Sequence, residues 1–280
     1  MRYFILIILL NINLFSKSLL WEIKSEKNTV YLLGSVHLAD SSLYPLNKEI
    51  LEAFDNSKVF VMEMDISRID PSEVMKYTML PDTFTLAGFV DENSYNKFAK
   101  LFEKHNIPNF LYNKMKPWFA VMTLQSLEMI QGRYSAEYGI DLYFLDKATT
   151  RNMPIKELES LEIQMNVLDT LNKFSGKFLE YTLKEINNTN DNVSKILKAW
   201  KQGDTTELSK IINAGSGEED FDKVMYVIND KRNFNMVKRI EEFLNDTEPH
   251  FVVVGVAHLL GENGLINLLK NKRKYKINQI

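Results

Sequence analysis

The sequence TVYLLGSVH at residues 29–37 and the sequence FVVVGVAH at residues 251–258 decide the fold of this 280-residue chain. Each is a run of β-branched, aromatic and aliphatic residues that ends in a histidine, and such runs predict strands buried on both faces. A third run, VFVMEMD at residues 59–65, has the same character and ends in acidic residues. Apolar strands separated by helical segments are typical of a buried, largely parallel sheet.

The segments between these strands have apolar residues spaced for helices. This periodicity extends from about residue 70 to about residue 245, and one short extended piece at 154–157 interrupts it. Further strands are expected at residues 20–23 and 275–280. The sequence therefore predicts a single α/β domain, in which N- and C-terminal strands build a largely parallel sheet and a large helical section lies between them.

The composition excludes several classes of function. The net charge is −3, so no basic excess indicates nucleic acid or an anionic membrane as a partner. The chain has no cysteine, which excludes disulfides, thiolate ligands and cysteine nucleophiles. A metal site would therefore use histidine, carboxylate, amide or water. Of the histidines, His105 and His250 lie among polar residues and are expected at the surface.

Residues 1–18 have the layout of a secretory signal peptide. Arg2 precedes an apolar run at residues 4–15, and Ser16-Lys17-Ser18 places small residues before a cut after Ser18. An uncleaved anchor or a buried first helix is the alternative. We expect export to the periplasm or the medium, and a mature chain, residues 19–280, without a membrane-spanning run.

Polar side chains follow three of the predicted strands, namely His37, Glu63 and His258. Ligands bind at the carboxyl ends of the strands in open parallel sheets, so these side chains are expected in one crevice. Gly34 and Gly255 each precede a histidine by three residues and permit close backbone approach. A single Gly-x-x-His is more often a hydrogen-bonded core histidine. Two of them at strand ends predict a shared site.

Glu63 and Arg232 have two interpretations each. A carboxylate that closes an apolar strand must be paired, hydrated or metal-bound, so Glu63 is either a structural ion-pair partner or a metal ligand or general base. Arg232 and Asn233 begin a predicted helix and share the spacing of its apolar stripe, so both can face inward. Arg232 could pair with Glu63 or hold a substrate oxyanion. A solvated arginine is the alternative.

Two helical residues complete the candidate site. Asp141 follows Gly139 and Ile140 at a predicted helix start, where an N-cap is its simplest role. Gln164 lies among apolar neighbours on the predicted helix 161–171, and it either lines the crevice or is exposed.

Six segments resemble the TraB/GumN family in the order in which they occur: LWEIKSEKNTVYLLGSVH, VMEMD, KPWFAVMTLQ, YGIDLYFLDKATTRNMPIKELESLEIQ, RNFNMVKRI and FVVVGVAHLLGENGLINLLK. The resemblance covers nearly all of residues 19–280, although position 35 is Ser where the family more often has Thr. It implies a relationship to the TIKI metal-dependent proteases and to a group with erythromycin esterase-like enzymes and haem-binding ChaN-like proteins. It also implies an α/β fold with a site made by His37, His258 and Glu63, with Arg232 at a basic position of the pattern.

Three hypotheses follow for the function. The first is a metal-dependent hydrolase, in particular a peptidase, whose ion lies on both histidines and leaves positions open for water and a substrate carbonyl. The resemblance favours Mn²⁺ or Co²⁺, with Zn²⁺ as an alternative. The second is an esterase-type hydrolase without metal, in which a histidine is the base. The third is an exported protein that binds a peptide, haem or another ligand without turnover. The candidate residues are Glu63 and Arg232 for catalysis, His37, His258 and Glu63 for metal, and Gly34, Gly255, Asp141, Gln164 and Asn233 for substrate binding or support.

Overall fold

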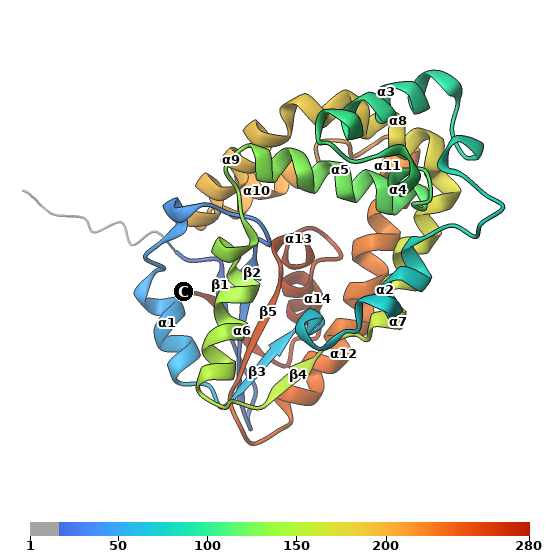
Figure 1. The fold of residues 1–280 in the computed structure, drawn as a ribbon. Helices are drawn as coiled ribbons and strands as arrows, with labels where there is room; N and C mark the ends of the chain where they lie inside the picture. Colours follow the sequence, from blue (N-terminus) through green and yellow to red (C-terminus); the bar gives the residue numbers. More distant parts are fainter. Residues whose placement is uncertain (1–16) are drawn as a thin grey trace, which may run out of the picture.

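The computed structural model describes residues 17–280, so the predicted signal peptide lies outside the described residues except for its last two positions. Within this range six strands form one sheet in the order β4-β3-β5-β2-β1-β6 (Figure 1). N-terminal and C-terminal strands therefore lie side by side, as the sequence predicts. The strands are β1 Leu20–Lys24, β2 Thr29–Ser35, β3 Val59–Met62, β4 Ile155–Glu157, β5 His250–Gly255 and β6 Lys276–Gln279.

Four neighbouring strands of the sheet are parallel. Strand β5 pairs in parallel with β2 and β3, and β3 pairs in parallel with β4, whereas β1 and β6 are antiparallel additions at one side. Ser35 of β2 lies opposite Gly255 of β5, and Met62 of β3 lies opposite Val253. The chain segments that follow β2, β3 and β5 consequently emerge at the same edge of the sheet.

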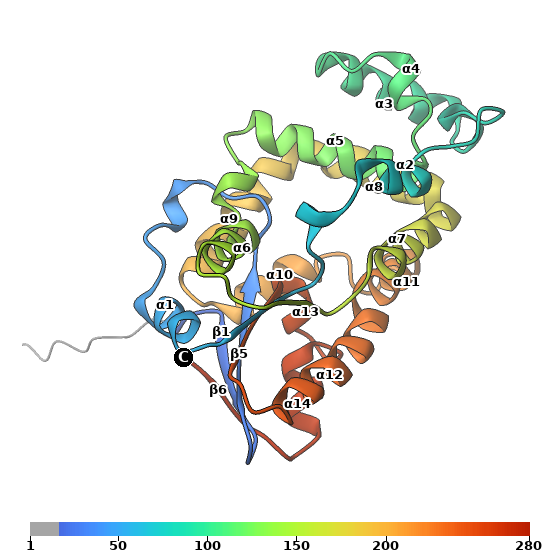
Figure 2. The same ribbon diagram turned by 60° about the horizontal axis from the view of Figure 1, so that its bottom comes forward.

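Helices cover both faces of the sheet, which explains why its central strands are apolar throughout (Figure 2). On one side α1 and α6 contribute Phe54 and Phe144, whose rings lie 5.0 Å apart and contact Phe251 of β5 at 5.3 and 4.7 Å. Such aromatic pairs each add about 0.5–1.5 kcal/mol beyond the burial of their area. On the other side, α12 buries the predicted stripe that includes Met236 and Ile240.

The helical middle section has a core of its own, built from α3, α4, α5 and α8 (Figure 1). No helix in residues 17–280 is long and apolar enough to cross a membrane. The helices are α1 Lys48–Asp55, α2 Pro71–Thr78, α3 Glu92–Lys104, α4 Asn109–Tyr112, α5 Pro117–Gln131, α6 Ile140–Thr150, α7 Leu161–Asp169, α8 Ser175–Glu185, α9 Thr189–Lys201, α10 Thr205–Ile212, α11 Glu219–Met225, α12 Lys231–Leu244, α13 Val256–Leu259 and α14 Leu265–Asn271.

A π-helical segment at Tyr226–Asp230 joins α11 to α12 without a break. The sequence predicts a helix that begins at Asp230, but the chain is already helical before that residue. Arg232 and Asn233 therefore do not lie at a free helix N-terminus. A π-helical turn shifts the faces of the flanking α-helices relative to each other, and such turns are frequent at functional sites.

The prediction that His105 and His250 are surface residues is wrong. His250 is fully buried at the start of β5, and its ring stacks on Phe243 with centroids 4.6 Å apart. His105 ends α3 and contacts Glu128 of α5 at 2.7 Å. Polar sequence neighbours predict exposure for both residues. The residues that bury them, Phe243 and Glu128, lie 7 and 23 positions away in the sequence.

Ser18, the last residue of the predicted signal peptide, is part of the fold. Its backbone N–H donates to the carbonyl of Ile280 at 2.7 Å, and its carbonyl accepts from Gln279 Nε2 at 2.9 Å. Its hydroxyl accepts from Asn47 Nδ2 at 2.9 Å. A chain that begins at Leu19 would lose these three hydrogen bonds.

Candidate functional site

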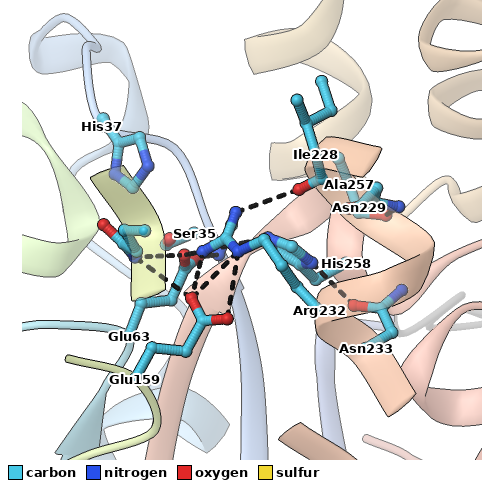
Figure 3. Close-up of polar contacts among 12 residues, drawn as sticks. Ser35, His37, Glu63, Glu159, Ile228, Asn229, Arg232, Asn233, Ala257 and His258 are labelled. Atoms are coloured by element: carbon cyan, nitrogen blue, oxygen red, sulfur yellow. Dashed lines mark hydrogen bonds and ion pairs between the residues drawn. The ribbon is translucent and has the colours of Figure 1, made fainter. Parts of the chain in front are cut away.

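The two Gly-x-x-His motifs and Glu63 meet at Gly255. A Cβ atom placed on Gly255 would lie 3.4 Å from Glu63 Oε1, 3.8 Å from His258 Cδ2 and 4.0 Å from His37 Nε2. Three side chains from separate parts of the chain thus surround one point at the edge of the sheet. In Figure 3 the two histidines are seen on either side of the Arg232 guanidinium.

His37 follows β2 and is held by a carboxylate. Its Nδ1 lies 2.8 Å from Asp141 Oδ2, and the hydroxyl of Ser35 donates to Asp141 Oδ1 at 2.7 Å. The charge of Asp141 and this hydrogen bond raise the pKa of His37 above its ordinary value. The imidazole is 70% exposed, so water screens the pairing. With Nδ1 directed at Asp141, the Nε2 atom is left for another partner.

His258 lies on α13, one turn after β5, and is held by a neutral amide. Asn233 Nδ2 donates to the carbonyl of Asn263 at 2.8 Å, which directs Asn233 Oδ1 toward His258 Nδ1 at 2.7 Å. Nδ1 must then be the protonated nitrogen of the neutral ring, and Nε2 carries the lone pair. Burial lowers the pKa of His258 to about 4, with Glu63 opposing the shift and Arg232 adding to it. The Nε2 atom lies 3.7 Å from Glu63 Oε2.

Glu63 follows β3 and is ion-paired. Its Oε1 accepts from the backbone N–H of Gly255 at 2.8 Å, and its Oε2 accepts from Arg232 and from Gln164 Nε2. Burial alone would raise the pKa of Glu63, but the charges of His258, Arg232 and His37 and the Gly255 amide outweigh it and lower the pKa to about 2. His258 is itself neutral near pH 7, so Arg232 and His37 are the cations that act on this carboxylate.

Arg232 joins two carboxylates across the site (Figure 3). Its Nε donates to Glu159 Oε2 at 2.9 Å, and its Nη2 donates to Glu159 Oε2 at 2.6 Å and to Glu63. Its Nη1 donates to the carbonyl of Ile228 in the π-helical segment at 3.1 Å. Among the described residues, these contacts use four of the five guanidinium N–H groups, which leaves one N–H on Nη1. The guanidinium is thus fixed in place, and one of its N–H groups can still donate to a ligand.

Glu159 belongs to the site although the sequence did not predict it. It follows β4 as Glu63 follows β3, and its backbone N–H donates to the carbonyl of Glu63 at 2.9 Å. Its side chain is 2% exposed and pairs with Arg232. The rule of polar groups at strand ends would have found Glu159 had it been applied to the short extended piece at 154–157. Ser35, which fixes Asp141, was missed because it belongs to the strand itself.

The supporting residues have clear positions. Asp141 is not an N-cap, because Gly139 occupies that position and Asp141 instead bonds His37 and Ser35. Gln164 lines the crevice and donates to Glu63 and Glu159, both at 3.3 Å. Gly34 lets α13 approach β2, since a Cβ there would lie 2.8 Å from Leu259 Cδ1.

A cavity of about 340 Å³ opens beside these residues. One part of its wall is polar and the rest is apolar. The lining residues are His37, Met62, Glu63, Met64, Met122, Ala136, Asp141, Leu142, Gln164, Val167, Leu168 and Arg232. A ligand can therefore reach the His37 imidazole, the Glu63 carboxylate and the Arg232 guanidinium from one side.

Comparison with known proteins identifies the family of the chain. A family model described as the TraB/PrgY/gumN family matches residues 19–279. The chain belongs to the TraB/PrgY/gumN family. Within it, the chain is similar to the "Uncharacterized protein YbaP" of Escherichia coli (strain K12) and of Shigella flexneri. Each is 24% identical over 240 residues, which span 86% of this chain and 87% of the relative. No solved structure matches the chain. The resemblance stated from the six sequence segments is confirmed at the level of the family.

The donor set of this TraB/PrgY/gumN site fits a metal ion through its two histidines. In metal-binding histidines the second ring nitrogen usually donates to a carboxylate, carbonyl or amide, and both His37 and His258 are held in this way. No group of three or more His, Asp or Glu side chains is arranged to hold an ion by itself in the part of the chain that the structure describes. Glu63 would become a third ligand through a lone pair that its present partners leave free.

Proposed function

We propose that the chain is a hydrolase that cleaves peptide bonds with the help of a divalent metal ion. The observation that carries this proposal is the arrangement of the histidines. Asp141 holds Nδ1 of His37 and Asn233 holds Nδ1 of His258, so the Nε2 atom of each ring is left for an ion, which would displace the proton of His37. Both rings lie close to Gly255. A carboxylate and a guanidinium adjoin them and can supply a third ligand and an oxyanion donor for metal-assisted hydrolysis.

His37 and His258 would hold the ion, with Glu63 as a third ligand. Imidazole and carboxylate suit Mn²⁺, Co²⁺ and Zn²⁺, and the family resemblance favours the first two. Such an ion, when bound, lowers the pKa of a water molecule and polarises the carbonyl of the scissile bond.

The protein side chains have separate tasks around this reaction. Asp141 and Asn233 fix the tautomer and the orientation of the two imidazoles. Arg232 offers its remaining Nη1–H to the oxygen that becomes negatively charged in the transition state. Glu159 fixes Arg232 in that position. Glu63 is a weak base because its pKa is lowered to about 2, so the geometry favours it as a ligand and not as the proton acceptor.

A second candidate is hydrolysis without a metal, and the His37–Asp141 pair favours it. An imidazole whose Nδ1–H is held by a carboxylate and whose Nε2 lines a cavity has the arrangement of a general base, and it acts as one when the pH exceeds its raised pKa. Ser35 is not a nucleophile in this scheme, because its hydroxyl donates to Asp141 and not to His37. Water would then be the attacking group.

The location outside the cytoplasm is also part of the proposal. It is supported by the charged start, the apolar run and the small residues of positions 1–18. Mass spectrometry of the protein recovered from the periplasm or the medium would give the first residue of the processed chain. Recovery of the intact chain from the cytoplasm alone would contradict export.

The test of the activity is hydrolysis of a mixed peptide library by wild-type protein and by the His37→Ala/His258→Ala variant. We expect cleavage that Mn²⁺ or Co²⁺ supports, that a chelator abolishes and that the variant lacks. His105→Ala is the matched control, because His105 lies outside the site, and it should cleave like the wild type. Cleavage that survives the chelator would support the metal-free candidate, and absence of cleavage under all conditions would contradict both.

A further inference from the structure

A second hollow of about 380 Å³ adjoins the cavity of the candidate site. It lies among α2, α5 and α7, and Met122 and Leu168 line both hollows. The residues that line it are Val74, Thr78, Trp118, Phe119, Met122, Thr123, Ser126, Leu127, Ile130, Met165 and Leu168. None of these residues is charged, so this hollow suits an apolar ligand and not an ionic one.

Helix α7 connects the second hollow to the carboxylates of Glu63 and Glu159. Gln164 donates to Glu63 and Glu159, and Leu168, one helical turn later, borders both hollows. Residues four apart lie on the same face of a helix. A ligand that extends along this face of α7 would therefore run from the reacting groups directly into the apolar hollow.

Methionines are concentrated along this path. Met62 and Met64 line the first hollow, Met165 lines the second, and Met122 lines both. Methionine side chains are flexible and polarizable, and they are common at surfaces that accept various apolar partners. The path is therefore suited to apolar side chains of different shapes.

The second hollow also contains polar groups that a hydrocarbon chain could not use. Thr123 and Ser126 carry hydroxyls on α5, one turn apart. A peptide carries a carbonyl at every residue and could accept hydrogen bonds from these hydroxyls, whereas an acyl chain has no acceptor along its length.

We propose that the two hollows form one groove for an extended peptide segment with apolar side chains adjacent to the scissile bond. This proposal rests on the proposed peptidase function and assigns its substrate class. The scissile bond lies beside His37, Glu63 and Arg232, and the apolar segment lies between α5 and α7.

The test uses a non-cleavable apolar peptide, with a reduced bond at the scissile position, and a polar peptide of equal length and charge. Binding is measured by calorimetry on wild-type protein and on Met122→Glu, which places a charge between the hollows. Met122 is 40% exposed, so the variant should fold. Ile163→Glu is the control, since Ile163 is 46% exposed on α7 and lines neither hollow. We expect Met122→Glu to weaken binding of the apolar peptide at least about tenfold and Ile163→Glu to leave it unchanged.

Equal affinity of the wild type for the apolar and the polar peptide would overturn the proposal, and so would equal binding of the apolar peptide by wild type and Met122→Glu. Preferential binding of dodecanoate over the apolar peptide would also overturn it, because the groove would then take an acyl chain. Binding does not require turnover. Selective binding by a protein that cleaves no peptide would uphold the groove and contradict the proposed hydrolase.

Discussion

The two Gly-x-x-His motifs have the same spacing but opposite environments. His37 is 70% exposed and contacts the carboxylate of Asp141, which raises its pKa. His258 is 7% exposed and contacts the neutral amide of Asn233, and burial lowers its pKa. The motif itself determines only that a histidine follows the strand and that a glycine permits close packing. The helices α6 and α12, which supply the partners, determine what each imidazole can do.

This difference divides the site into an outer and an inner half. The outer half consists of His37 and Asp141. The His37 imidazole lies at the cavity wall and favours the protonated state in the absence of a ligand. The inner half holds a neutral imidazole next to the buried network of Glu63, Arg232 and Glu159. Changes in the inner half should therefore affect stability strongly, whereas changes in the outer half should mainly affect function.

The largest effect is expected from removing the central cation of the inner half. Arg232→Met leaves Glu63 and Glu159 buried without their shared partner, and breaking such a pair costs about 3–5 kcal/mol. Urea unfolding would measure this loss in the free energy of unfolding. The control is Arg239→Met on the same helix, whose exposed pair with Glu242 should contribute less than about 1 kcal/mol. Similar losses for both variants would mean that the inner network is not a stabilising unit.

The next effect is a pH dependence that distinguishes the two histidines. Unfolded His258 takes up a proton near pH 6.5, whereas folded His258 does so only near pH 4. Acid therefore favours the unfolded chain, and stability should fall between pH 6.5 and pH 4 by on the order of 2 kcal/mol. His258→Gln should flatten this part of the profile of unfolding free energy against pH.

The contribution of His37 to the free energy of unfolding changes with pH in the opposite direction. Its pairing with Asp141 stabilises the folded chain below pH 6.5, and this contribution is lost as the pH rises through the raised pKa of the folded state. Solvent screens the pair, so the change should be small. A profile that His37→Gln flattens at acid pH, in place of His258→Gln, would contradict the assignment of the two halves.

Substitutions of the two motif glycines should likewise separate an effect on stability from an effect on metal binding. Gly34→Ala places a Cβ 2.8 Å from Leu259 Cδ1 and should cost about 1–2 kcal/mol, because a flexible side chain can yield part of the space. Gly255→Ala meets nothing closer than 3.4 Å and should leave stability nearly unchanged. Its methyl group would occupy the point between both histidines and Glu63, so metal binding should weaken at least tenfold. Thermal unfolding and metal titration of both variants test this contrast.

The smallest effect is expected at Ser35, which acts on His37 only through Asp141. Ser35→Ala removes one hydrogen bond to Asp141 Oδ1 and should cost about 1 kcal/mol of stability. Ser35→Thr keeps the hydroxyl and should retain the wild-type rate in the peptide assay, whereas Ser35→Ala should lower it severalfold. Equal rates for the two variants would show that Asp141 does not need this support.

The strands and the convergence of the two motifs could be predicted because apolar strand runs and the parallel-sheet rule are properties of local sequence. Glu159 was missed because β4 is only three residues long and reads Ile-Lys-Glu, so the rule for polar groups after apolar strands was not applied to it. The role of Asp141 was missed because its partners lie more than one hundred residues away in the sequence. The π-helical turn before Arg232 has no periodicity of its own that differs visibly from an α-helix. Local sequence pattern could therefore predict neither the side-chain pairings between distant parts of the chain nor this π-helical turn.

The central claim is that one divalent ion lies on both Gly-x-x-His motifs. Its most direct test is calorimetric titration of the protein with Mn²⁺ and Co²⁺, using residues 17–280, the single variants His37→Ala and His258→Ala, and His105→Ala as the control. The account predicts one ion per chain for the wild type and for His105→Ala, and affinity lower by at least tenfold for each of the other two variants. Undiminished binding in either His37→Ala or His258→Ala, or no binding by the wild type, would contradict it.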